Sequence, residues 1–139
     1  MEFNGTKIAL MIGNKTVVLL RDNQDGFEDA NKWDLPGGGR EGSESPEECG
    51  IREIKEELLI DIDPKTITWK KEYDSLYQPG TKVWFMVAEL GDNLVKNIRL
   101  GDENQKYEIM KISEFLENPN ALEYCKSRLK EYLDSKTKL

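Results

Sequence analysis

The sequence contains no histidine and only two cysteines in 139 residues, which removes several kinds of active site. Without histidine, the chain lacks Ser-His and Cys-His nucleophile pairs and any imidazole-bound zinc. Cys49 and Cys125 are far apart and do not have the spacing of metal ligands, so we expect reduced thiols in a cytoplasmic protein. Catalysis at neutral pH would therefore depend on carboxylates, lysines, tyrosines or a metal ion.

Long apolar runs and an excess of positive charge are also missing. No stretch approaches the ~20 apolar residues that a membrane-spanning helix needs, and the N-terminus has no signal-peptide pattern. The formal net charge of −7 disfavours sequence-independent binding of a nucleic-acid polymer. A phosphorylated small molecule stays compatible with this charge, because a divalent cation can bridge acidic protein groups and phosphates.

The 139 residues fit a single domain, spanning 1–139, and their pattern is typical of an α/β fold. Strand-like apolar segments occur at residues 7–12, 16–21, 66–73, 83–90 and 107–112. The first two flank Gly13-Asn14-Lys15, which predicts a β-hairpin, and the polar stretch Asn23–Lys32 predicts a flexible loop. Consecutive apolar residues at 17–20 indicate a sheet that is covered on both faces.

A helix is predicted after the Gly37-Gly38-Gly39 segment. Ser45 can act as its N-cap, Pro46 takes the favoured first position, and Glu48 completes a capping box with Ser45. This helix should run to about Leu58 or Leu59.

The chain should end in a second helix that begins near Asn120. Its apolar stripe consists of Leu122, Cys125, Leu129 and Leu133. Ser113 is a candidate cap for a short helical turn before it. Together these elements predict a mixed β-sheet with helices against both faces.

The first helix carries an unusual group of charges. With ~100° between successive residues, Glu53, Glu56 and Glu57 share one arc, which borders the core-facing stripe of Ile51, Ile54 and Leu58. Like charges at these spacings cost roughly 0.2–0.5 kcal/mol per pair, and the helix C-terminus disfavours anions by a further ~0.3–1 kcal/mol each. One interpretation is a solvated face on which Arg52 pairs with Glu48 and Glu56. The other is a Mg²⁺ site, since Mg²⁺ is held by a few carboxylates and substrate phosphates.

The wider context resembles a known signature. The spacings of the Nudix box are matched by Gly38, Glu44, Arg52, Glu53, Glu56 and Glu57 within residues 38–60. Ile54 and Ile60 fill its apolar positions. One position differs from the Nudix box: Leu59 stands where the family usually has the glycine that ends the helix. A leucine there would cost about 1 kcal/mol in a left-handed conformation or would end the helix differently.

This resemblance to the Nudix hydrolases implies a Nudix-type α/β/α sandwich, with the box helix on one face of the sheet and the C-terminal helix on the other. It implies hydrolysis of a pyrophosphate bond in a nucleoside diphosphate-linked substrate. Mg²⁺, or Mn²⁺ in its place, would be bound by the Gly38 carbonyl, Glu53, Glu56 and Glu57. Arg52 and Glu44 would orient these carboxylates. The general base would be Glu53 or a carboxylate outside the box.

Further similarities point to the MutT-like branch. Leu100–Gln105 is similar to a Gly-x-Glu-Gly-Gln stretch of that branch, which makes Glu103 a candidate metal ligand and base; the alternative is an ordinary loop acid. The segment 31–38, which includes Leu35 and Gly37, is similar to the branch's entry to the box. These two residues and Gly38 are therefore candidate substrate contacts.

Two other residues have alternative roles. Arg21 would contact the nucleotide or form a surface ion pair. Asn120 would read the purine edge or serve as the N-cap of the last helix.

The branch implies that the substrate is a (d)NTP, including oxidised purine triphosphates such as 8-oxo-dGTP, cut to a monophosphate and pyrophosphate. An alternative is a dinucleoside polyphosphate or an ADP-linked compound, because Tyr77 follows Ile60 at a spacing similar to that of a base-stacking tyrosine in some such hydrolases. A third possibility is a nucleotide-binding sensor that does not cleave. The expected partner is in each case a small-molecule nucleotide, and the sequence does not indicate the oligomeric state.

Overall fold

The computed structural model describes residues 2–23 and 29–137, so residues 24–28 of the predicted flexible loop lie outside the described residues. Its sheet comprises β1 (Gly5–Ile12), β2 (Lys15–Arg21), β3 (Trp33–Asp34), β4 (Gly37–Gly39), β5 (Ile67–Asp74), β6 (Lys82–Glu89) and β7 (Asn104–Lys111). The strand order is β3-β2-β1-β6-β5, with β4 also paired to β1 and β7 to β2. β1 and β6 are parallel and β1 and β2 antiparallel, so the sheet is mixed, as predicted.

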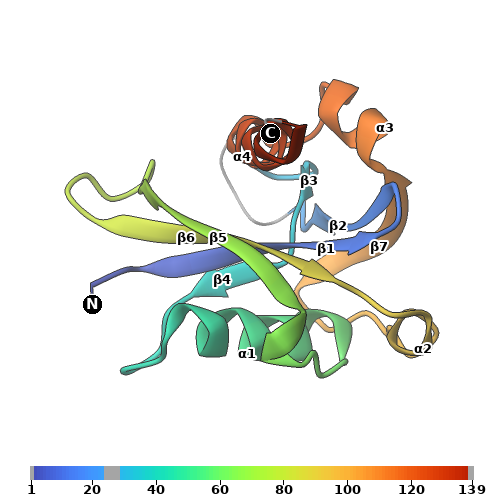
Figure 1. Ribbon diagram of the computed structural model, residues 1–139, viewed down its shortest axis with the longest axis horizontal. Helices are drawn as coiled ribbons and strands as arrows, with labels where there is room; N and C mark the ends of the chain where they lie inside the picture. The colour runs from blue at the N-terminus through green and yellow to red at the C-terminus, as the bar shows by residue number, and fades with distance from the viewer. Residues whose placement is uncertain (1, 24–28, 138–139) are drawn as a thin grey trace.

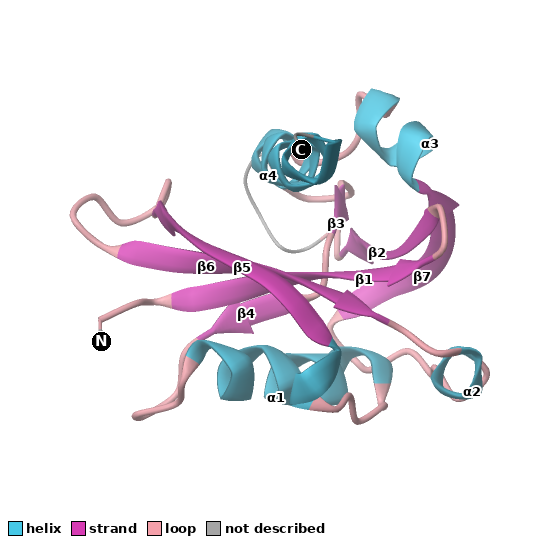
Figure 2. Ribbon diagram, in the orientation of Figure 1, coloured by secondary structure: helices cyan, strands magenta, loops and turns pink. Residues whose placement is uncertain are grey.

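Helices cover both faces of this sheet (Figure 1). α1 (Pro46–Leu58) lies on one face, and α4 (Glu123–Thr137) lies on the other beside α3 (Ile112–Glu117). The short α2 (Asp92–Val95) follows β6, and Figure 2 shows the same layers by element type. The predicted α/β/α sandwich is confirmed. Among the described residues, no helix is both long and apolar enough to cross a membrane.

Each face of the sheet has its own hydrophobic core. Ala9, Val18 and Val87 pack with Cys125 and Leu129 of α4 on one side. On the other side, the alternate residues of the same strands pack against Ile54 and Leu58 of α1. These strand residues are Ile8, Leu10, Val17, Leu19 and Met86. Successive residues of a strand point to opposite faces, which explains why the central strands are apolar at consecutive positions. Both cysteines are buried and free.

The predicted start of α1 is confirmed. Ser45 Oγ accepts a hydrogen bond from Glu48 N at 3.1 Å, and Glu48 Oε1 accepts one from Ser45 N at 2.8 Å. The helix ends at Leu58, and Leu59 follows in the left-handed conformation with φ 57° and ψ 34°. A leucine therefore adopts the conformation that the family's glycine usually provides.

Three predicted boundaries were wrong. β7 begins at Asn104, three residues earlier than expected, because it pairs with β2 as far as Arg21. Ser113 lies inside α3 and does not cap it.

The last helix begins at Glu123, not near Asn120. The chain stays extended before it, because Ala121 forms a β-bridge with Trp33 and Leu122 N donates to Trp33 O at 3.0 Å. Pairing with β3 therefore delays the start of the helix.

Candidate active site

The glycine strand β4 holds two glutamates of α1 in place. Gly37 N donates a hydrogen bond to Glu57 Oε1 at 2.8 Å. A β-carbon on Gly38 would lie 2.1 Å from Glu53 Oε1, and one on Gly37 would lie 2.1 Å from the carbonyl oxygen of Thr6. Side chains at these positions would collide with their neighbours, so the two glycines allow β4 to lie directly against the carboxylates.

Glu53 and Glu57 are unusually buried for carboxylates, each being 8% exposed. Burial raises the pKa of Glu53 to about 7, although Arg52 acts in the opposite direction. Burial also raises the pKa of Glu57 to about 7, against the influence of Lys7 and of the Gly37 N–H. Among the described residues, none donates a hydrogen bond to Glu53 Oε2. Arg52 Nη1 lies 3.5 Å from this oxygen, which is too far for a good hydrogen bond. A buried acceptor without a hydrogen bond is costly, and a cation bound at this oxygen would remove that cost.

The predicted pair of Arg52 and Glu44 is present. Arg52 Nε lies 2.6 Å from Glu44 Oε2, and Arg52 Nη2 donates to the Gly39 carbonyl at 2.7 Å. The hydrogen bond to Glu44 is the main influence that raises the pKa of Arg52 above its ordinary value. Arg52 also donates to Glu56 at 3.1 Å, whereas Glu48 is used by the capping box. Arg52 thus links α1 to β4 and to the segment before the helix.

An acidic pocket of about 480 Å³ opens at this point. Its lining comprises Lys7, Leu19, Arg21, Asp22, Asp34, Gly37, Gly38, Gly39, Glu53, Glu57, Glu103 and Asn104. Glu103 therefore reaches the same pocket as two box glutamates, although it lies 46 residues or more further along the chain. Gly101 brings it there, because its N–H donates to the carbonyl of Glu57 at 2.8 Å.

Glu56 is not among the residues that line this pocket, and its side chain is 47% exposed. Within residues 2–23 and 29–137, no three acidic or cysteine side chains stand close enough together to hold a metal ion as they are placed. A site built from three of these side chains would therefore require the glutamates to reorient.

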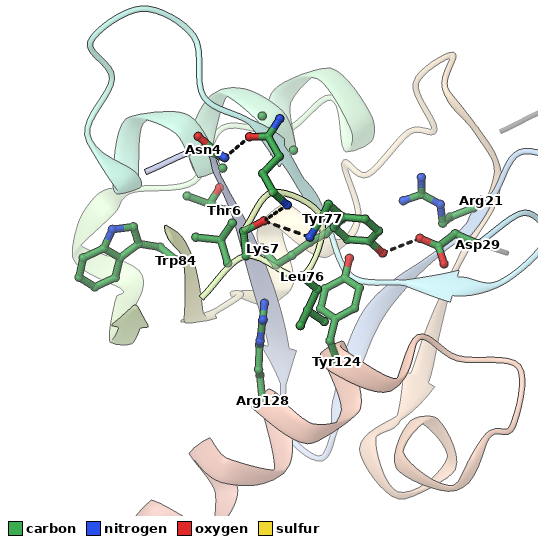
Figure 3. Close-up of a pocket in the computed structure, with 16 residues that line it drawn as sticks. Asn4, Thr6, Lys7, Arg21, Asp29, Leu76, Tyr77, Trp84, Tyr124 and Arg128 are labelled. Atoms are coloured by element: carbon green, nitrogen blue, oxygen red, sulfur yellow. Dashed lines mark hydrogen bonds between the residues drawn. The ribbon is translucent and has the colours of Figure 1, made fainter. Parts of the chain in front are cut away.

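A larger pocket of about 940 Å³ adjoins the acidic one (Figure 3). The two share four residues, Lys7, Arg21, Gly38 and Gly39. Tyr77 and Tyr124 meet edge to face in its wall, with ring centres 6.1 Å apart. Tyr77 Oη also donates to Asp29 Oδ2 at 2.7 Å, as the dashed line in Figure 3 shows. This pocket combines aromatic surfaces with charged groups, which suits a ring system that carries phosphates.

A cluster of charges lies beneath the wall that the two pockets share. Lys7 Nζ and Arg21 Nη1 each lie 2.8 Å from the same oxygen, Asp34 Oδ2. The other oxygen, Asp34 Oδ1, accepts from Leu35 N at 2.7 Å and from Cys125 Sγ at 3.3 Å. Burial alone would raise the pKa of Asp34, but Lys7 and Arg21 hold it below the ordinary value. Asp34 is therefore a fixed anion that orients two cations.

The predicted substrate contacts differ in their placement. Arg21 lines both pockets and is paired with Asp34, which is buried, so this ion pair is not the surface pair that was the alternative. Contact with the nucleotide stays a prediction. Gly37 and Gly38 line the acidic pocket. Leu35 has no exposed surface and packs in the core under α4, which leaves its side chain no access to a bound molecule.

Asn120 lies outside the linings of both pockets. Its amide donates to the carbonyl of Asn31 at 2.7 Å, and its carbonyl accepts from Trp33 N at 2.9 Å. The alternative role as N-cap was wrong, because the helix begins three residues later. In this arrangement Asn120 fastens the chain before α4 to the segment before β3.

Sequence reasoning missed several residues that line the pockets: Asn4, Lys7, Asp29, Tyr124 and Arg128. Each comes from a different part of the chain or stands in a pattern that indicates ordinary packing. Tyr124, for example, immediately precedes the buried Cys125 of the apolar helix stripe. No local motif marks such residues.

Comparisons with known proteins agree with this geometry. The family model described as the NUDIX domain matches residues 4–131, and the chain therefore belongs to the Nudix family. The 8-oxo-dGTP diphosphatase of Proteus vulgaris is 31% identical over 77 residues, which cover 55% of this chain and 64% of that protein. Nudix hydrolase 5 of Arabidopsis thaliana is 25% identical over 107 residues, 76% of this chain and 35% of that protein. The match thus spans less than two thirds of either relative's length.

Solved structures share the fold at low identity. MutT from Methanosarcina mazei Go1 gives a TM-score of 0.73 at 22% identity, covering 96% of this chain and 94% of that one. A bifunctional NMN adenylyltransferase/ADP ribose pyrophosphatase from Francisella tularensis, complexed with AMP and a Mn ion, gives 0.76 at 16% identity, covering 97% of this chain and 42% of that one. These likenesses establish the Nudix fold for the chain.

Proposed function

We propose that this chain is a Mg²⁺-dependent Nudix pyrophosphohydrolase of the MutT-like type. Its substrate is a (d)NTP or an oxidised purine dNTP such as 8-oxo-dGTP, which it cuts to a nucleoside monophosphate and pyrophosphate. One observation carries the proposal: the glycines of β4 hold the carboxylates of Glu53 and Glu57 nearly buried beside a pocket. Glu53 Oε2 accepts no hydrogen bond from the described residues, and Arg52 Nη1 lies 3.5 Å from it.

The residues present fit a magnesium ion. Mg²⁺ takes oxygen ligands and is held by one or two carboxylates together with substrate phosphates. Glu53, Glu57 and the Gly38 carbonyl would hold it, with Glu56 and Glu103 as further carboxylates at the edge of the site. When bound, Mg²⁺ neutralises phosphate charge and lowers the pKa of the attacking water.

The chain itself positions the substrate and moves the proton. The nucleoside occupies the larger pocket beside Tyr77 and Tyr124, and the phosphates extend past Arg21 into the acidic pocket. Either Glu53 or Glu103 accepts the proton of the attacking water. The new P–O bond then forms as the bridging P–O bond of the pyrophosphate linkage breaks. Arg52 and Glu44 keep α1 aligned with β4 throughout.

The matched relatives support this substrate class, since one is named an 8-oxo-dGTP diphosphatase and one structure is named MutT. A second candidate is the hydrolysis of ADP-ribose, other ADP-linked compounds or dinucleoside polyphosphates. The volume of about 940 Å³ favours it, because a base alone leaves much of that pocket empty. A sensor that binds without cleaving is less consistent with this chain, because its box glutamates are all retained.

A substrate panel tests the proposal. The purified protein is incubated with dGTP, 8-oxo-dGTP, ADP-ribose and diadenosine tetraphosphate, with and without Mg²⁺, and products are separated by chromatography. We expect Mg²⁺-dependent release of monophosphate and pyrophosphate from a triphosphate. Much faster turnover of ADP-ribose or the diadenosine compound would favour the second candidate. Binding without turnover of any compound would contradict both.

A further inference from the structure

Lys7 occupies a position in β1 where a buried cation faces both pockets. It pairs with Gly37 of β4 on one side and with Phe85 of β6 on the other. Its side chain is 16% exposed, and it contributes to the lining of the acidic pocket and of the larger one. Figure 3 labels it among the residues that line the larger pocket, next to Thr6 of the same strand. Lys7 thus lies where the two pockets join.

Lys7 shares its buried anion with a second cation. Lys7 Nζ and Arg21 Nη1 each lie 2.8 Å from Asp34 Oδ2, so one carboxylate oxygen serves two cations at the shared wall. Burial works to lower the pKa of Lys7, but Asp34 more than offsets it, so the ammonium stays charged. An ammonium has three N–H donors, and among the described residues it donates one hydrogen bond, to Asp34. Its other donors can serve a bound anion.

A purely structural ion pair is the competing explanation. Buried ion pairs contribute little to stability compared with apolar residues of similar volume, and Asp34 would keep Arg21 as a partner without Lys7. A structural role also does not require the lysine to line two pockets. The position of Lys7 is better explained by contact with something that extends from one pocket into the other.

We propose that Lys7 binds the phosphate that joins the nucleoside to the scissile bond, with Asp34 holding the ammonium in place. This inference rests on the proposed function. A nucleotide with its ring in the larger pocket and its scissile phosphates beside Glu53 must cross the shared wall. The residues of that wall are Lys7, Arg21, Gly38 and Gly39, so the two cations are the groups there that can neutralise a phosphate.

The test replaces the ammonium while keeping the fold. In Lys7→Met, Asp34 remains paired with Arg21, so we expect a folded protein. A hydrogen bond to a charged group contributes about 1.5–3 kcal/mol, so the KM for the best substrate of the panel should rise about 10- to 100-fold while kcat changes less than about threefold. Lys15→Met is the matched control, since Lys15 is an exposed lysine at the far end of the same hairpin, and its KM should not change.

The outcomes separate the two proposals. If the wild type hydrolyses no nucleotide, the proposed function fails. If it does and the KM of Lys7→Met rises less than threefold, the role of Lys7 fails alone. Should Lys7→Met not fold, wild-type protein labelled with ¹³C at lysine Cε is titrated with GMP, and Lys7→Arg identifies the Lys7 resonance. A clear shift of that resonance supports phosphate contact, and an unmoved resonance on saturation with GMP overturns it.

Discussion

The carboxylate of Glu53 lies against the bare α-carbon of Gly38, where an added β-carbon would stand 2.1 Å from Oε1 and 2.4 Å from Cδ. The helix and the glycine strand are therefore fitted to each other at the atoms that the proposed chemistry uses. A strand of larger residues would push the carboxylate out of the acidic pocket.

Gly38→Ala should therefore abolish most of the activity. The new methyl group displaces Glu53, and we expect kcat to fall at least about 100-fold, in line with the effect of misplacing a reacting group by about 1 Å. Steady-state kinetics and a thermal melt are the measurements. Gly91→Ala is the control, because a β-carbon at Gly91 meets nothing within 4 Å. Wild-type kinetics in a folded Gly38→Ala protein would contradict the proposed role of β4.

Glu57→Gln separates catalysis from stability. The pKa of Glu57 is about 7 in the folded protein against an ordinary value of 4.5, so the ionised carboxylate destabilises the metal-free fold. This penalty is absent below about pH 4.5, grows between pH 4.5 and 7, and is complete above pH 7. Glutamine keeps an oxygen for the Gly37 N–H but carries no charge. In EDTA, the Tm of the variant should therefore exceed that of the wild type at pH 8 and match it at pH 4.5.

The same variant should lose Mg²⁺-dependent turnover. Adding Mg²⁺ at pH 8 should raise the Tm of the wild type, because an ion that binds the folded state stabilises it by RT ln(1 + [L]/Kd). The increase should be much smaller in Glu57→Gln. A marked loss of stability in EDTA, at both pH values, would instead assign the acidic cluster a structural role.

Leu59 offers a test of backbone strain away from the site. It has φ 57°, and its side chain is 48% exposed, so little burial offsets the left-handed conformation. Leu59→Gly should stabilise the protein by about 0.5–1 kcal/mol. This value is the backbone strain that the change removes, minus the extra free energy needed to order a glycine, which is more flexible in the unfolded chain. Leu59→Ala keeps the β-carbon and should bring no gain. Chemical denaturation measures both, and kcat should stay unchanged.

The parts of the site that follow local rules could be predicted from the sequence. The capping box of Ser45 and Glu48 and the shared arc of the glutamates depend on helical geometry over a few residues, which spacing alone specifies. Glu103 was also predicted, from its short similarity to the MutT-like branch, and it lines the acidic pocket.

Other contacts could not be predicted, because they depend on how distant parts of the chain pack together. Lys7 meets Asp34 across 27 residues without any local pattern that marks the pair. The spacing that singled out Tyr77 does not point to its neighbour Tyr124, 47 residues further along. Asn120 failed as an N-cap for the same reason, since the bridge between Trp33 and Ala121 keeps that segment extended. Local helix signals cannot reveal a competing strand partner that lies far away in the sequence.

The aromatic wall of the larger pocket provides the last prediction. If the nucleoside ring packs on Tyr77, then Tyr77→Ala should raise the KM by about 5- to 100-fold, because stacking of a base on an aromatic ring contributes about 1–3 kcal/mol. Tyr77→Phe keeps the ring and loses the hydrogen bond to Asp29, so it should stay within about threefold of the wild type. Tyr77 is 65% exposed, so neither change should lower the Tm appreciably. If both variants keep the wild-type KM, the nucleoside ring lies elsewhere. If the KM rises equally in both, the effect belongs to the hydrogen bond with Asp29.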